Sequence, residues 1–352
     1  MLSFLLRRSG VMLLTALCLT FVVFFLVNLD PNLEKLAKSE GNQRMTDAQV
    51  ESWLDRNGYR QPLVKRYGEW LGVMPGWTRT TDEGATAGRC IGRTPVPAEQ
   101  AEQAASYCGL LQGNWGFSTV FKEPVGGIVL NKLGLTGKLM FFVLLVMVPS
   151  ALVIGVIAGM REGSKTDRTL STFSILTTST PEYVSGVILI VVFASRLTGL
   201  RWFNGTAASA MENATFSNFT LPVIALALYG MGYIARMTRA SMAEVMQEQY
   251  IRTARLKGLG FYSVVLKHAL RNALIAPFTV IMLQIPWLLT GVVIIETLFN
   301  YKGFGWTLVQ AVGNNDIETM MAVSVVAVFV VLITQLISDI GYVFLNPRIR
   351  VS

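Results

Sequence analysis

Few residues in this chain have the types and the spacing that enzyme chemistry requires. The single histidine, His268, lies in a basic stretch and not in a cluster of cysteines and histidines, so a metal site has little support. The sequence shows no nucleophile and base in a catalytic pattern. It also lacks the phosphate-binding motif, because Gly137-Lys138 has Lys132 where the first glycine should be. We therefore predict that this chain is not an enzyme and holds no cofactor and no metal of its own.

The most distinctive residues form two basic stretches. They read Tyr250-Ile-Arg-Thr-Ala-Arg-Leu-Lys-Gly-Leu-Gly260 and Lys267-His-Ala-Leu-Arg-Asn-Ala-Leu-Ile-Ala-Pro277. Gly258 and Gly260 stand where a helical run from about Ser241 to Lys257 should end, because glycine readily adopts the left-handed conformation that follows a helix. We expect a protruding loop at about 241–272 in which two short helices meet at a glycine.

Composition predicts the elements that position these residues. Of 352 residues, 52% are hydrophobic and 15% charged, whereas a soluble domain carries about 25% charged residues. Several uncharged runs reach the length of about 20 residues that a helix needs to cross a hydrocarbon layer of about 30 Å. The sequence therefore predicts an all-α polytopic membrane protein. Its six expected transmembrane helices cover residues 9–29, 139–160, 169–195, 221–235, 273–295 and 320–343.

The net charge of +8 favours a membrane topology over nucleic-acid binding. Positive residues gather at alternate ends of the expected helices and predict that both termini are cytoplasmic. They are Arg7, Arg8, Arg161, Lys165, Arg168, Arg236, Arg239, Arg252, Arg255, Lys257, Lys267, Arg271, Arg348 and Arg350. Only Glu162, Asp167, Glu244 and Glu248 oppose them in the same stretches. Because no cleavage site of small residues follows the first apolar run, we expect an uncleaved first helix and not a signal peptide.

This topology divides the chain into three parts. Residues 1–29 form the first transmembrane helix, 30–138 an external region, and 139–352 a core of five helices. The external region is nearly balanced in charge and contains amphipathic pieces, so we expect a small folded domain between the first two helices.

Both basic stretches resemble one family of transport proteins. The wider family has Glu-Ala-Ala where this chain reads Arg252-Thr253-Ala254, and only Ala254, Gly258 and Leu270 fit that generic signature. The peptide branch, however, typically reads Tyr-Ile-Arg-Thr-Ala-Arg-x-Lys-Gly-Leu and His-Ala-Leu-Arg-Asn-Ala, and this chain reproduces both. The chain thus resembles the first permease subunit of bacterial ABC importers of the dipeptide and oligopeptide branch, which has the type I importer fold.

The resemblance implies a function, a location and partners. The chain would form half of the translocation pathway for di- and oligopeptides in the bacterial inner membrane. Its partners would be a second permease, two ATPases that bind ATP and Mg, and an external substrate-binding protein. The coupling loop would dock into an ATPase through Tyr250, Arg252, Thr253, Ala254, Arg255, Lys257, Gly258 and Leu259. Ala254 is small enough to let a partner approach, and Leu256 and Leu259 offer apolar contact.

Two alternatives stay open at this point. Nickel and oligosaccharide importers share this branch, so the substrate is not fixed by the motifs. A secondary transporter would also be polytopic and basic inside, but it should show inverted repeats, which we do not see.

The external region carries a further candidate feature. Its flanks resemble the family, whereas an insert at about 76–111 departs from it and contains Cys90 and Cys108. A segment outside the bacterial cytoplasm meets an oxidising compartment, so we expect these two cysteines to form a disulfide. Two free thiols are the alternative. We expect Cys18 to pack inside the first helix.

Two acidic residues lie within expected transmembrane helices. Glu182 follows Pro181, which breaks the third helix, and an acid near mid-membrane costs several kcal/mol unless it faces a partner or water. Glu182 is therefore a candidate pathway residue, with a structural bond to a neighbouring helix as the alternative. We expect Asp339 to pair with the partner permease.

Overall fold

The computed structural model describes residues 2–81 and 84–345. These residues divide into two compact units. The first contains residues 2–9, 132–306 and 330–345, and the second contains residues 10–81, 84–131 and 307–329. The basic residues Arg348 and Arg350 of the expected inner tail lie outside the described residues.

Most of the chain is helical, and within residues 2–81 and 84–345 four helices are long and apolar enough to cross a membrane. They are α1 (Leu2–Val27), α6 (Val125–Gly159), α9 (Phe216–Met246) and α15 (Ile317–Leu345). Two bent helix pairs in this described part of the chain raise the number of possible spans there to six. One pair joins α7 (Lys165–Ser179) and α8 (Glu182–Phe193) at an angle of 104°, and the other bends by 52° before α13 (Ile275–Leu298).

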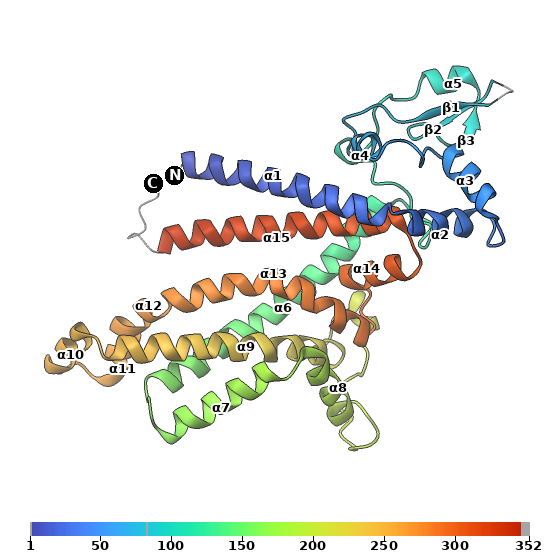
Figure 1. Cartoon of the computed structure of the whole chain (residues 1–352). Coiled ribbons are helices and arrows are strands. Elements are labelled where there is room, and N and C mark those ends of the chain that lie inside the picture. Colours follow the sequence, from blue (N-terminus) through green and yellow to red (C-terminus); the bar gives the residue numbers. More distant parts are fainter. Residues whose placement is uncertain (1, 82–83, 346–352) are drawn as a thin grey trace. The chain divides into compact units, whose positions relative to one another are not determined.

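The core of the first unit lies around α9, which contacts α7, α8 and α13. Figure 1 shows α9 and α13 side by side. Large side chains such as Leu226, Ile234 and Leu288 are fully buried there. Gly232 permits the close approach of α7, because a Cβ at this position would lie 2.4 Å from the carbonyl oxygen of Ser174. Small residues between packed helices are typical of proteins whose helices lie in a membrane.

Several helices extend beyond the apolar runs that predicted them. Helix α6 begins at Val125 and not near Leu139, so the end of the expected external region, up to residue 138, continues the span as helix. Helix α9 likewise begins at Phe216 and ends at Met246. Hydropathy detects only the apolar part of a helix, whereas backbone hydrogen bonds can continue through polar residues. Lys138 lies within α6, and its Nζ donates to the carbonyl oxygen of Ala210 at 3.3 Å.

The second unit contains a bundle of short helices with its own core. These helices are α2 (Asp30–Glu40), α3 (Asp47–Arg56) and α4 (Leu63–Leu71). Their buried residues include Leu36, Leu54 and Trp70, which cluster with residues of α1 and α15 that belong to the same unit. A capping box starts α3, where the backbone N–H of Thr46 donates to Gln49 Oε1 at 3.0 Å.

The insert folds around a small antiparallel sheet that the expectation of an all-helical chain missed. Its strands lie in the order β1 (Thr78–Thr80), β2 (Thr86–Gly88) and β3 (Gly92–Val96). Such short strands give no measurable alternation of apolar and polar residues. The helix α5 (Ala98–Glu102) and the 3₁₀ helix η1 (Leu110–Gln112) follow.

The three cysteines lie in two different settings. Cys90 and Cys108 form a disulfide within the second unit, with their Cα atoms 5.4 Å apart. Cys18 is exposed on α1, so the expectation that it packs was wrong.

Candidate functional site

The basic loop is built from short helices that follow α9. After Met246 the chain turns at Gln247 and Glu248, and α10 (Gln249–Leu256) begins. The expected continuous run from Ser241 to Lys257 is therefore wrong. The backbone of Glu248 is extended, with ψ of 146°. No glycine or proline marks this break, which is why the sequence did not indicate it.

Helix α10 is amphipathic and buries one side against its own chain. Ile251 is fully buried and Ala254 is 6% exposed, in a cluster with Val264, Val265 and Met242. Ala254 thus packs inside the loop and has little surface of its own; its expected role in letting a partner approach stays a prediction.

The opposite side of α10 is open. Leu256 is 81% exposed and Leu259 40% exposed. Arg252, Arg255 and Lys257 are exposed beside them. An exposed leucine with exposed cationic residues near it in the sequence is suited to a partner surface that is acidic and apolar.

Gly258 makes the bend after α10. Its φ is +75°, the left-handed region, and its N–H donates to the carbonyl oxygen of Arg255 at 2.9 Å. Gly260 has φ of −63°, so only the first of the two glycines uses the conformation that favours glycine.

The chain then returns to α9 through three short helices. They are α11 (Phe261–Ser263), the π-helix η3 (Val264–Ala269) and α12 (Leu270–Ala273). Asn272 Nδ2 donates to the hydroxyl of Tyr250 at 2.8 Å, and Ser241 Oγ donates to the carbonyl oxygen of Ala273 at 2.9 Å. These bonds connect the return segment to α10 and α9. Figure 1 shows α10, α11 and α12 grouped at the end of α9.

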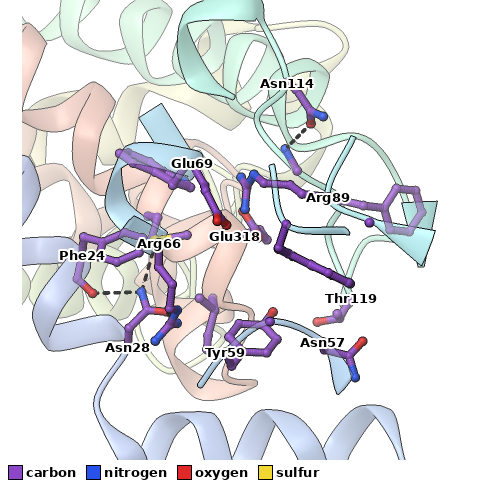
Figure 2. A pocket seen from close by; sticks show the side chains of 18 of the residues that line it. Phe24, Asn28, Asn57, Tyr59, Arg66, Glu69, Arg89, Asn114, Thr119 and Glu318 are labelled. Atoms are coloured by element: carbon purple, nitrogen blue, oxygen red, sulfur yellow. Dashed lines mark hydrogen bonds between the residues drawn. The ribbon is translucent and has the colours of Figure 1, made fainter. Parts of the chain in front are cut away.

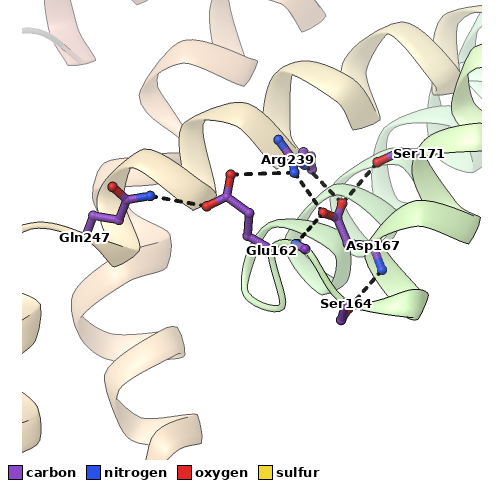
Figure 3. A network of polar contacts seen from close by, with 7 residues as sticks. Glu162, Ser164, Asp167, Ser171, Arg239 and Gln247 are labelled. Carbon is purple, nitrogen blue, oxygen red and sulfur yellow. Dashed lines mark hydrogen bonds and ion pairs between the residues drawn. The ribbon is translucent and has the colours of Figure 1, made fainter.

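A polar network that the sequence did not reveal lies on α9 near this loop (Figure 3). Arg239 donates to both carboxylate oxygens of Asp167, with Nε 3.0 Å from Oδ1 and Nη2 2.7 Å from Oδ2. Asp167 also accepts from the N–H of Gly163 at 2.9 Å and from Ser171 Oγ at 3.1 Å. Ser164 caps α7 by accepting from the N–H of Asp167 at 3.1 Å.

Glu162 connects this network to the turn before α10. Its carboxylate lies 3.6 Å from Arg239 Nη2, and it accepts from Gln247 Nε2 at 3.2 Å. Through Glu162, the loop between α6 and α7 thereby contacts Arg239 on α9 and Gln247 in the turn that leads into α10. The cap pattern Ser164-x-x-Asp167 was the one local signal for this network in the sequence.

The two acids of the expected transmembrane helices lie in the first unit. Glu182 is the first residue of α8 and is half-buried. It faces α13, because a Cβ added at Gly291 would lie 3.6 Å from Glu182 Oε1. Asp339 pairs with Arg8 of the same chain, with Oδ2 2.5 Å from Nη2. Asp339 thus has an ion-pair partner within its own chain, and its expected pairing with the partner permease stays a prediction.

Among residues 2–81 and 84–345, no three or more His, Cys, Asp and Glu side chains lie together as metal ligands would. His268 is exposed on η3, next to Lys267.

Comparison with known proteins agrees with the motifs. The family described as "Binding-protein-dependent transport system inner membrane component" matches residues 151–351. The "Probable peptide ABC transporter permease protein y4tP" of Sinorhizobium fredii is 33% identical over 80% of this chain and 90% of that relative. The "Di/tripeptide transport system permease protein DppB" of Pseudomonas aeruginosa is 30% identical over 99% of both chains.

A solved structure also resembles this chain. It is described as an amino acid ABC transporter with histidines, and it has a TM-score of 0.46 and 17% identity over 61% of this chain and 93% of the other. The family match covers more than half of the sequence, and the relatives are similar over most of it. This chain therefore belongs to the family of inner membrane components of binding-protein-dependent transport systems.

Proposed function

We propose that this permease forms half of a pathway that imports di- and oligopeptides across the bacterial inner membrane. The proposal is supported by relatives named as peptide and di/tripeptide permeases. In this assignment each bent helix pair is one span, which gives six spans with both termini in the cytoplasm. The second unit then contains the external region between the first two spans. A second permease completes the pathway, and an external binding protein delivers the substrate.

The energy comes from separate ATPase subunits, which bind ATP and Mg. The observation that carries this assignment is the division of α10 into two sides. Ile251 and Ala254 hold the helix on its own chain, while Leu256 remains 81% exposed among cations. When a partner covers an exposed apolar side chain, the burial contributes about 25 cal/mol per Å² of apolar surface. The exposed side therefore serves as the contact that transmits ATPase motion to α9.

A matched pair of variants tests the docking surface. Leu256→Asp places a charge at the centre of the proposed contact, so the ATPases should separate from the permease during purification. Leu197→Asp is the control, because Leu197 is 86% exposed and lies after α8, far along the chain from the loop. Retention of the ATPases and normal uptake by Leu256→Asp would contradict the coupling assignment.

A second experiment tests the substrate class. The intact assembly, purified from its native membrane, should contain the partner chains and peptides bound to the external binding protein, as identified by mass spectrometry. Nickel or an oligosaccharide in place of peptides would replace the substrate assignment and leave the coupling assignment unaffected.

A further inference from the structure

The second unit contains a cavity of about 540 Å³, and none of the residues that line it belongs to the coupling loop. Its walls come from α1, α4, the segment around Tyr59, the small sheet and the start of α15. Figure 2 shows the side chains that line it. The volume falls within the range of about 300–1,000 Å³ that is typical of small-molecule sites.

Two carboxylates on the cavity wall have oxygen atoms without donors. Glu69 of α4 is 2% exposed, and its Oε1 has no hydrogen-bond partner among the described residues. Oε2 of Glu318, on α15, likewise has no hydrogen-bond partner among the described residues. A buried acceptor without a partner costs about 1–3 kcal/mol, and more when it is charged. A ligand that donates hydrogen bonds would remove this cost.

The backbone leaves room for Glu318 in particular. Gly116 has φ of +86°, and a Cβ added there would lie 2.6 Å from Glu318 Oε2. The chain therefore passes close to this carboxylate without donating to the oxygen that remains unpaired.

Two guanidinium groups line the same cavity. Arg66 is 9% exposed, donates to Asn28 Oδ1, and places its guanidinium carbon 5.2 Å from the ring centre of Tyr59. Arg89 lies on the cavity wall together with Glu69 and Glu318 (Figure 2). Burial lowers the pKa of Arg66 and raises the pKa of Glu69, since each loses water around its charged form.

These charges determine what can bind. The lining holds two positive and two negative side chains, so a ligand with only one sign of charge would be repelled by half of them. Aromatic walls supply apolar contact, from Tyr59, Trp70, Trp77 and Phe117. We propose that the cavity binds a small zwitterion, with its ammonium group at Glu69 and Glu318 and its carboxylate at Arg66 and Arg89. All residues of this site belong to the second unit, whereas the residues of the coupling loop belong to the first. Short peptides or amino acids have the required chemistry.

Calorimetric titration of the full permease in lipid nanodiscs tests the proposal. Ala-Ala should bind, whereas N-acetyl-Ala-Ala, which lacks the ammonium, and Ala-Ala amide, which lacks the carboxylate, should bind at least tenfold more weakly. Glu69→Gln and Glu318→Gln should each weaken Ala-Ala binding at least tenfold. The matched control is Glu51→Gln, an exposed glutamate of α3 that pairs with Arg60, which should keep normal affinity.

Several results would overturn the zwitterion site. They are absence of Ala-Ala binding, equal binding of the blocked analogues, and unchanged affinity in both glutamine variants, which would locate binding elsewhere. Loss of the external binding protein from Glu69→Gln with normal Ala-Ala binding would make the cavity a protein-docking socket instead. If the glutamine variants unfold, Arg89→Gln on the half-buried opposite charge should lower Ala-Ala affinity in the same way.

Discussion

Arg239 and Asp167 form a two-point ion pair between α9 and α7, with nitrogen-to-oxygen distances of 3.0 and 2.7 Å. The Asp167 side chain is 4% exposed and that of Arg239 is 31% exposed. Helix α9 leads directly toward α10, so this pair fixes the start of α7 to the element that would receive ATPase motion. Planar, two-point contacts of this kind are stronger and more directional than single ones.

We expect Asp167→Asn to weaken this connection. It removes the charge from hydrogen bonds worth about 2 kcal/mol together, so the purified permease should unfold at a lower temperature and transport less per ATP hydrolysed. Glu162→Gln is the control, because its contact with Arg239 is longer, at 3.6 Å, and partly exposed; its effect should stay within about 0.5 kcal/mol. Equal behaviour of the two variants would contradict a special role for Asp167.

The bend after α10 permits a comparison of two glycines. Gly258→Val forces a β-branched residue into the left-handed region and should cost about 1–3 kcal/mol, so that uptake into proteoliposomes falls while membrane insertion stays normal. Gly260→Val should be tolerated, because its φ is −63°. An added Cβ meets nothing within 4 Å at either position, so crowding does not explain a difference. Normal uptake by Gly258→Val would remove the rigid bend from the mechanism.

Glu182 is expected to border the translocation pathway. Glu182→Gln should lower substrate-stimulated uptake several-fold and leave assembly with the partner subunits intact. Glu212→Gln, on the exposed segment after the 3₁₀ helix η2 (Ala208–Met211), should transport normally. Failure of Glu182→Gln to accumulate in the membrane would favour a structural bond to a neighbouring helix.

The disulfide is expected to be present in protein from native membranes. Non-reducing peptide mapping should find Cys90 linked to Cys108, which are 18 residues apart. A loop of this size corresponds to about 3 kcal/mol in the chain-entropy description, so reduction should increase proteolysis of the insert. Cys18→Ser should change neither result. Alkylation of Cys90 and Cys108 without prior reduction would exclude the link.

The sequence predicted the apolar helices well because hydropathy measures what a membrane requires. It also predicted the break at Pro181, where the chain loses a backbone donor. It did not predict the break at Glu248, because tertiary packing of Ile251 and Ala254 against Val264 creates it, without a local breaker residue.

The polar pairs could not be predicted from the sequence for a different reason. Arg239 and Asp167 are 72 residues apart in sequence, and each alone looks like a charge that sets topology. Glu69 and Glu318 come from opposite ends of the chain and share a cavity only after folding. Periodicity and local motifs contain no information about such pairs, so only the three-dimensional structure brings them together.

The 104° angle between α7 and α8 restricts where lipid can lie. A helix end leaves its last carbonyl groups without partners inside the helix. Here the carbonyl oxygen of Leu176 accepts from Thr180 Oγ1 at 2.9 Å, which satisfies one of them. Acyl chains have no hydrogen-bond donors for the others. If the two helices form one span, the remaining carbonyl groups must contact water or protein donors, and the annular lipid shell of the permease is interrupted at this bend.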